Sequence, residues 1–208
     1  MSELELRRRP TQARSAATFD HILDTATVLL EDVGWDGFTT NLLAERAGIG
    51  VQTLYRYFPN KLSVVATLAE RKIEEWDNWS EQIVDLLDPE GTDWGRGVLI
   101  CLDGLRNQPG GIAIRRAMGA SPALRELDRE DNVRIAHRFA DAIAAADPSV
   151  DPEQAAIALR VTLEAVMAVL DVTFDMTKAD ADAHVDACVT MQAAYLERCF
   201  PNFGGKRR

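Results

Sequence analysis

Apolar side chains recur every three or four residues along most of the chain, which is the period of an amphipathic α-helix. The first such segment carries one regular apolar stripe: Phe19, Ile22, Leu23, Ala26, Leu29, Leu30 and Val33. Gly34 follows directly and predicts the end of this helix, because glycine is common just past a helix C-terminus. No useful length alternates as a strand would, so the chain is predicted to be all-α.

Turn and cap signals divide the rest of the chain into further helices. Pro59-Asn60 predicts a break, after which Asn60 caps a long helix over 61–87. Ser121-Pro122 and Asp151-Pro152 each predict a helix start, because a capping side chain precedes a proline that suits the first helical position. Beyond the first helix, the predicted helices are 40–46, 51–57, 61–87, 93–106, 112–118, 122–146, 152–176 and 180–200.

The two shortest predicted helices, 40–46 and 51–57, meet across a turn centred on Gly48, where glycine can adopt a positive φ without steric cost. Small and apolar residues supply their inner face: Leu43, Ala44, Ala47, Ile49 and Leu54. This is the pattern of a helix-turn-helix, whose second helix enters the major groove of DNA.

The outer face of the second of these helices suits DNA. Gln52 can pair with adenine, and Thr53 can contact a thymine methyl group. Tyrosine hydroxyls and Lys61 can bind phosphates, and Lys61 begins a helix whose free N–H groups already favour an anion. The outward residues are Gln52, Thr53, Tyr55, Arg56 and Tyr57.

Charge at first opposes this interpretation, because the formal net charge is −10 and phosphate binding requires Lys and Arg. However, residues 1–63 hold seven Lys and Arg against eight Asp and Glu, so the acidic excess lies almost wholly in the remainder. Four arginines gather near the start: Arg7, Arg8, Arg9 and Arg14. They predict either an arm along the DNA backbone or in a minor groove, or a disordered, solvated basic tail.

Other classes of protein are disfavoured. The hydrophobic share of 47 % is enough for a core, but no run of about 18 apolar residues predicts a membrane span. The first ten residues lack the apolar region of a secretory signal, so we expect a cytoplasmic protein. No nucleophile elbow, phosphate loop or paired acid and base is present, and we therefore expect neither an enzyme nor a cofactor.

Cysteine and histidine usage also argues against a metal site. The cysteines are odd in number and lack CxxC spacing, which predicts reduced thiols on helices: Cys101, Cys188 and Cys199. The histidines stand far apart in the sequence: His21, His137 and His184.

The run Thr53-Leu54-Tyr55-Arg56-Tyr57-Phe58-Pro59-Asn60-Lys61 resembles the most recognisable stretch of the tetracycline-repressor (TetR) family of bacterial regulators. The preceding segments 44–49, 22–26 and 31–34 match the same family, so the resemblance covers about residues 14–68. It implies a three-helix DNA-binding domain, residues 1–63, followed by a roughly six-helix ligand-binding and dimerisation domain, residues 64–208. No metal or cofactor is implied.

The resemblance also implies roles for single residues. Gln52 and Thr53 fall where the family reads bases, Val51 offers an apolar contact, and Asn41 lies where some members reach a base. The implied phosphate contacts are Thr40, Tyr55, Tyr57 and Lys61.

Two departures from the family pattern shift the expected affinity towards Lys61, the tyrosines and the N-terminal arginines. Leu42 stands where an acidic residue often completes the capping box begun by Thr39. Gly50 stands where Ser or Thr often caps the second helix and touches a phosphate.

The last two long helices are predicted to form a homodimer through a four-helix interface, which explains recognition of a palindromic operator. The first stripe is Ala155, Ala156, Leu159, Leu163, Val166, Met167, Leu170 and Phe174, and the second is Val185, Cys188, Val189, Met191, Gln192 and Tyr195. Periodicity alone leaves open that these stripes are only intramolecular core.

The resemblance further implies a small-molecule effector bound among the middle helices. We expect an apolar or aromatic ligand lined by Trp76, Trp79, Ile83, Leu102, Met118, Phe139 and Met167, each of which is otherwise ordinary core. The resulting hypothesis is a repressor released from double-stranded DNA by an effector. The alternatives are an activator, a ligand-independent repressor, or a helical dimerisation module that does not bind DNA.

Overall fold

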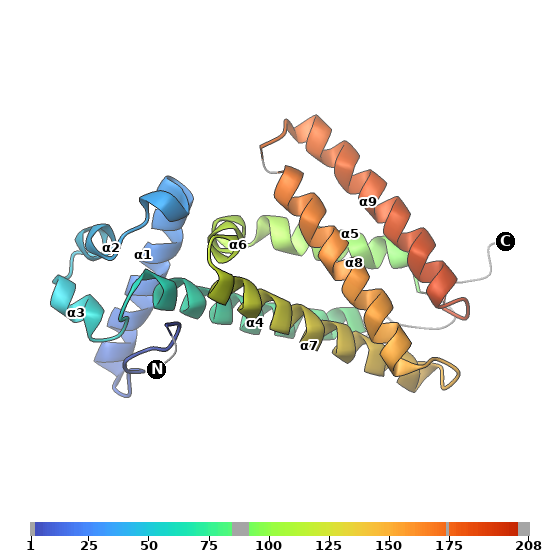
Figure 1. Ribbon diagram of the computed structural model, residues 1–208, viewed down its shortest axis with the longest axis horizontal. Helices are drawn as coiled ribbons and strands as arrows, with labels where there is room; N and C mark the ends of the chain where they lie inside the picture. Colours follow the sequence, from blue (N-terminus) through green and yellow to red (C-terminus); the bar gives the residue numbers. More distant parts are fainter. Residues whose placement is uncertain (1–2, 85–91, 174, 204–208) are drawn as a thin grey trace. The chain divides into compact units, whose positions relative to one another are not determined.

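The computed structural model describes residues 3–84, 92–173 and 175–203, apart from the side chains of 76–84, 103 and 105–107. The elements in these ranges are all helices, so the predicted all-α class is confirmed (Figure 1). They are α1 Ala13–Gly37, α2 Thr40–Arg46, α3 Val51–Tyr55, α4 Lys61–Val84, α5 Trp94–Asn107, α6 Gly111–Gly119, α7 Pro122–Ala146, α8 Pro152–Thr173 and α9 Lys178–Cys199. None of the described helices is both long enough and apolar enough to cross a membrane.

Local capping chemistry explains where several helices begin. Asn60 accepts a hydrogen bond from the Ser63 backbone N–H at 2.8 Å, and Asp151 accepts one from Glu153 at 3.0 Å, which confirms both predicted caps. By contrast, α9 begins two residues earlier than predicted, because Thr177 caps it by accepting from the Asp180 N–H at 3.3 Å.

The chain divides into two compact units. The first unit comprises Met1–Glu75 and Gln108–Asp128, and the second comprises Trp76–Asn107 and Arg129–Arg208. The two units are defined by how the helices pack. The boundary predicted after residue 63 instead separates the DNA-binding domain from the ligand-binding and dimerisation domain, and it stays a prediction.

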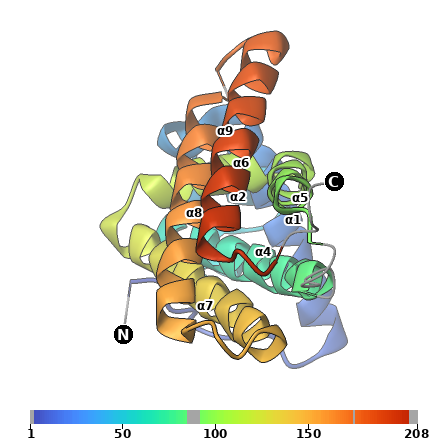
Figure 2. The same cartoon turned by 90° about the vertical axis from the view of Figure 1, so that its right-hand side faces the viewer.

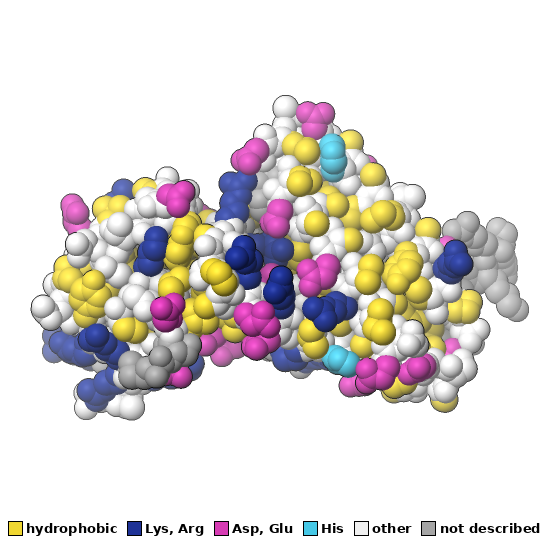
Figure 3. All heavy atoms as spheres, in the orientation of Figure 1, with side chains coloured by type: hydrophobic (Ala, Val, Ile, Leu, Met, Phe, Trp, Pro, Cys, Tyr) yellow, Lys and Arg dark blue, Asp and Glu magenta, His cyan; other side chains and the backbone are white. Residues whose placement is uncertain are grey.

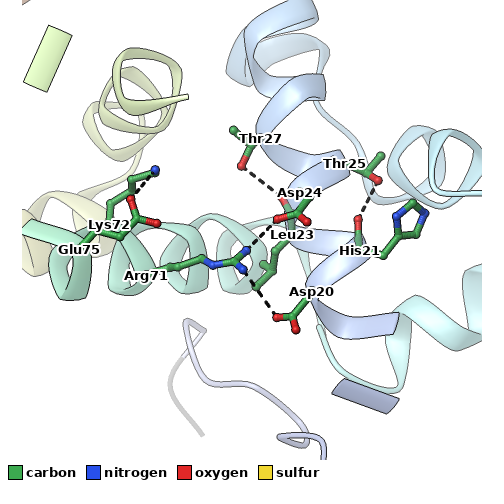
Figure 4. Close-up of polar contacts among 9 residues, drawn as sticks. All are labelled: Asp20, His21, Leu23, Asp24, Thr25, Thr27, Arg71, Lys72 and Glu75. Atoms are coloured by element: carbon green, nitrogen blue, oxygen red, sulfur yellow. Dashed lines mark hydrogen bonds and ion pairs between the residues drawn. The ribbon is translucent and has the colours of Figure 1, made fainter. Parts of the chain in front are cut away.

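The first unit has a core built from α1, α2, α3, the start of α4 and α6. Phe19 of α1 stacks on Phe58 with ring centroids 5.1 Å apart. On the surface, Arg71 of α4 lies 2.9 Å from Asp24 and 3.8 Å from Asp20 of α1, so one guanidinium joins the two helices (Figure 4).

The second unit has a separate core formed by α5, α7, α8 and α9, with α8 and α9 side by side (Figure 2). Trp94 closes one end of this core by donating from Nε1 to the Phe203 carbonyl at 3.2 Å.

This core contains most of the residues predicted to form the dimer stripes. Buried here are Ala155, Ala156, Leu159, Leu163, Val166, Met167, Leu170, Val185, Cys188 and Gln192, and Val189 packs against them. For these residues the intramolecular alternative holds, because the subunit's own helices cover the stripe. Met191 and Tyr195 remain exposed, and Phe174 lies outside the described residues.

Candidate nucleic-acid interface

The turn between α2 and α3 is fixed by backbone hydrogen bonds. The Ile49 N–H donates to the Ala44 carbonyl at 3.0 Å and the Gly48 N–H to the Glu45 carbonyl at 3.1 Å, which is the Schellman arrangement. This arrangement requires a left-handed residue, and Gly48 has φ +64°, as its position predicts. The turn thereby sets the direction in which α3 leaves α2.

The outward face of this pair carries the predicted base readers. Asn41 and Gln52 are exposed, whereas Val51 and Thr53 are half-buried, and Val51 packs partly against the core of the first unit. The side chain of Gln52 therefore has the freedom that bidentate pairing with a base edge requires.

Two of the predicted phosphate-binding residues lie together. The Thr40 hydroxyl on α2 and the Tyr55 hydroxyl on α3 are hydrogen-bonded at 3.0 Å. Both side chains are half-buried, so their hydroxyls sit at the surface with restricted motion. A phosphate oxygen at this point can accept from one hydroxyl while the pair keeps its mutual orientation.

Tyr57 differs from its expected phosphate role. Its residue surface is only 2 % exposed, and its ring packs edge-on against Phe19 with centroids 5.6 Å apart. Its hydroxyl points to the Ser15 carbonyl at 3.5 Å. The structure thus places Tyr57 in the core beneath the interface, because its ring packs against Phe19 on the inward-facing stripe of α1.

Lys61 is held in place by a residue that the sequence did not identify. Its ammonium nitrogen lies 3.8 Å from the centre of the Trp35 ring and donates to the Trp35 carbonyl at 3.3 Å. Trp35 reaches this position because the helical conformation breaks at Gly34, with φ +63° and ψ −177°, a region essentially open to glycine alone. No recognised motif marks Trp35, and only its place after Gly34 offered a signal.

Some charged side chains of the first unit are ion-paired, whereas others are not. Carboxylates on α1 and α4 are paired, with Arg46 at 3.0 Å from Asp32 and Arg9 at 3.2 Å from Glu70. Arg8, Arg14, Arg56 and Lys61 form no ion pair with any described carboxylate. Lys and Arg side chains gather near α3 and the start of α1 (Figure 3).

The predicted effector-binding residues do not all lie together. Leu102, Phe139 and Met167 share the core of the second unit, whereas Met118 belongs to the core of the first. The side chains of Trp76, Trp79 and Ile83 lie outside the described residues.

The cysteines are free, in agreement with the predicted reduced thiols. Desolvation raises the pKa of Cys101 to about 12, and burial also raises the pKa of Cys188, so both thiols stay protonated. Across the described residues, no group of three or more His, Cys, Asp and Glu side chains is arranged to hold a metal ion.

Comparisons with known proteins agree with this arrangement. Residues 22–68 match the family described as bacterial regulatory proteins, tetR family, and residues 100–196 match the tetracyclin repressor-like C-terminal domain. A curated relative, the HTH-type transcriptional repressor KstR of Rhodococcus jostii, is 32 % identical over 61 % of this chain and 50 % of the relative. The chain thus spans about half the length of this relative and of the class C tetracycline repressor protein of Escherichia coli, at 50 % and 48 %.

Solved structures extend the likeness to both units. A TetR-family regulator from Streptomyces coelicolor aligns with a TM-score of 0.63 and 23 % identity, covering 88 % of this chain and 99 % of that one. A TetR variant from Acinetobacter baumannii in complex with minocycline aligns with a TM-score of 0.58 and 26 % identity, covering 87 % and 97 %. The two family matches cover the helix-turn-helix and the second half of the chain, and they show that the chain belongs to the tetR family of bacterial regulatory proteins.

Proposed function

We propose that this chain is a transcriptional repressor that binds a palindromic operator as a homodimer and is released by a small-molecule effector. The observation that carries the proposal is the Schellman turn at Gly48, which directs α3 so that Gln52 is exposed beside the Thr40–Tyr55 hydroxyl pair. A helix placed in this way suits the major groove, and its flanking hydroxyls suit the phosphates on either side.

Each residue of the interface has a separate proposed role. Gln52 and Thr53 read base edges, Asn41 reaches a further base, and Val51 offers a limited apolar contact. Thr40, Tyr55 and Lys61 bind phosphates, and Lys61 does so from a fixed position above Trp35. Tyr57 is proposed to support α3 from below.

The dimer is proposed to form through α8 and α9, on α8 through a different stripe from the predicted one and on α9 through the exposed members of the predicted stripe. Ile157, Val161 and Val172 on α8 are each more than half exposed, and with Ala165 and Ala168 they follow the spacing of one helical face. On α9, Met191 and Tyr195 are exposed four residues apart. Hydrophobic side chains gather over this part of the surface (Figure 3), as expected of a self-complementary interface.

An effector site is proposed within the second unit. The amide nitrogen of Asn132 on α7 is buried and has no hydrogen-bond acceptor, and leaving such a donor unpaired costs about 1–3 kcal/mol. Asn132 continues the buried stripe of α7 that includes Ile135 and Phe139. An apolar or aromatic ligand that carries a carbonyl or carboxylate oxygen would satisfy this donor, and we propose that class of effector.

We propose that the repressor leaves the operator when the distance between the DNA-binding helices α3 of its two subunits changes. The dimer would engage half-sites about 34–36 Å apart, and an effector that prefers another separation lowers operator affinity. A coupling free energy of about 1–3 kcal/mol gives a response of roughly 5- to 150-fold. This role is non-enzymatic and is carried out in the cytoplasm.

The experiment that tests the function is selection of bound duplexes from a random DNA pool by the purified protein, followed by sequencing. We expect a palindromic consensus whose half-sites are regularly spaced. A folded dimer that enriches no sequence at moderate salt would contradict the proposal and favour a helical dimerisation module that does not bind DNA.

A further inference from the structure

The N-terminal segment 3–10, here called the strap, is held against the first unit. The Arg7 backbone N–H donates to the Tyr57 carbonyl at 2.9 Å, and the Asn60 side-chain amide donates to the Glu3 carbonyl at 3.0 Å. Leu4 and Leu6 pack against the core of the same unit. The strap is therefore a fixed element of the DNA-binding unit, which disfavours the solvated-tail alternative.

Two of the three consecutive arginines hold the strap in place. The Arg7 guanidinium donates to the Tyr55 carbonyl at 3.3 Å, at the C-terminal end of α3, where a cation is favoured by the helix dipole. The Arg9 guanidinium lies 3.2 Å from the Glu70 carboxylate on α4. These contacts tether the strap to α3 and to α4, one on each side of Arg8.

Arg8 is the arginine of the strap that remains available. Its side chain is exposed, and it has neither a hydrogen bond nor an ion pair with any described residue. Because its neighbours are anchored, its charge is confined to a small region beside the end of α3. An uncompensated guanidinium held in a fixed place is a suitable partner for an anion of fixed position.

The position of the strap indicates which anion Arg8 can bind. Tyr55 and Tyr57, whose carbonyls hold the strap, lie at the exit of the recognition helix. When such a helix lies in the major groove, the phosphate backbone passes its ends. Lys and Arg side chains gather at this edge of the unit, near α3 and the start of α1 (Figure 3).

We propose that Arg8, which lies outside the helix-turn-helix, binds a phosphate of the operator backbone, and that the strap holds Arg8 in position for this contact. This inference rests on the proposed DNA-binding function. Insertion into a minor groove would require a longer free tether, whereas anchored neighbours leave Arg8 only the reach of its own side chain. The contact therefore adds affinity without sequence preference.

The test compares wild type with Arg8→Ala on the duplex selected above, by fluorescence anisotropy from 50 to 200 mM salt. We expect the slope of log affinity against log salt to fall by about one per subunit, with affinity reduced about tenfold at low salt. Arg8→Lys should keep most of the slope. The matched control is Lys178→Ala, which removes one exposed charge from the second unit and should leave the slope unchanged.

Each other outcome overturns the assignment. An Arg8→Ala variant with the wild-type slope would show that Arg8 contacts no phosphate. A changed base preference in sequences flanking the half-sites would show minor-groove insertion instead. Both results require that wild type binds the duplex, so they are distinct from failure of the proposed function, in which wild type selects no DNA.

Discussion

The DNA-facing surface of the first unit and the α8–α9 surface of the second unit are specified in different ways. In the first unit, two of the proposed DNA contacts follow residues that fix the backbone: Gln52 follows the turn at Gly48, and Lys61 follows the Asn60 cap. In the second unit, α8 carries apolar residues on two faces, with Leu159 buried and Val161 exposed.

This difference shows what local sequence can specify. A cap or a positive-φ glycine acts through its own backbone, so it places neighbouring side chains whatever lies elsewhere in the fold. An apolar stripe stabilises the fold only by packing against other elements. In a helix with two apolar faces, the tertiary arrangement therefore decides which face stays exposed.

The largest expected effect tests the free face of α8. We expect Val161→Glu to abolish the dimer at micromolar concentration and to weaken operator binding more than 100-fold, because a symmetric interface would bury two unpaired carboxylates at a cost of several kcal/mol. Light scattering after gel filtration measures the mass, and anisotropy measures the affinity.

Val28→Glu is the matched control for this substitution. Val28 lies on α1 and is 54 % exposed, against 52 % for Val161. We expect it to leave the dimer intact, since α1 carries no proposed dimer contact. If Val161→Glu remained dimeric, the exposed stripe would not be the interface, and the contrast between the two units would fail.

Much of the DNA-facing surface of the first unit could be predicted from the sequence, because the residues that determine it act locally. The Asn60 cap and the turn at Gly48 are formed as predicted. The sequence did not identify Trp35 as the support of Lys61, because their contact joins residues 26 positions apart. The sequence predicts Tyr57 on the outer face because it extends the helix to residue 57, whereas α3 ends at Tyr55 and helical periodicity no longer sets the direction of Tyr57.

The second expected effect tests base readout. We expect Gln52→Ala to relax preference at one base pair per half-site, with a loss of about 1–3 kcal/mol of discrimination, because alanine cannot pair with both acceptor and donor of adenine. Competition binding on operators changed at single positions measures this loss. Arg56→Ala, which removes an exposed charge at the end of α3, should instead weaken binding to all of these duplexes alike. Equal losses on every duplex for both variants would contradict the separate roles.

The third expected effect tests whether Trp35 positions Lys61. We expect Lys61→Ala to lower the salt slope by about one per subunit on all sequences. Trp35→Ala should lose part of the same affinity, and the double variant should bind no more weakly than Lys61→Ala alone, since the two residues act through one contact. Trp35→Phe, which keeps a ring beneath the ammonium, serves as the control. Additive losses in the double variant would show that Trp35 supports the fold without orienting Lys61.

The smallest expected effect concerns Gly50, the cap of α3. Gly50 has φ −66° and ψ 140°, which any residue adopts, and a Cβ placed there meets no atom within 4 Å. A serine oxygen can accept from the free N–H groups of the first turn, so we expect Gly50→Ser to stabilise the protein by about 0.5–1 kcal/mol and to raise Tm by about 1–4 °C.

Gly50→Ala separates the two sources of this gain. Alanine restricts the unfolded chain as serine does, but it cannot cap the helix or touch a phosphate. The difference between the two variants in calorimetric Tm and in operator affinity therefore measures the hydroxyl alone, and we expect serine to exceed alanine in both. If both variants were stabilised but bound DNA more weakly than wild type, the phosphate backbone would approach position 50 too closely for any side chain. Glycine at position 50 would then be required for the close approach of DNA. The sequence of the first unit would in that case be determined by DNA contact as well as by its own backbone geometry.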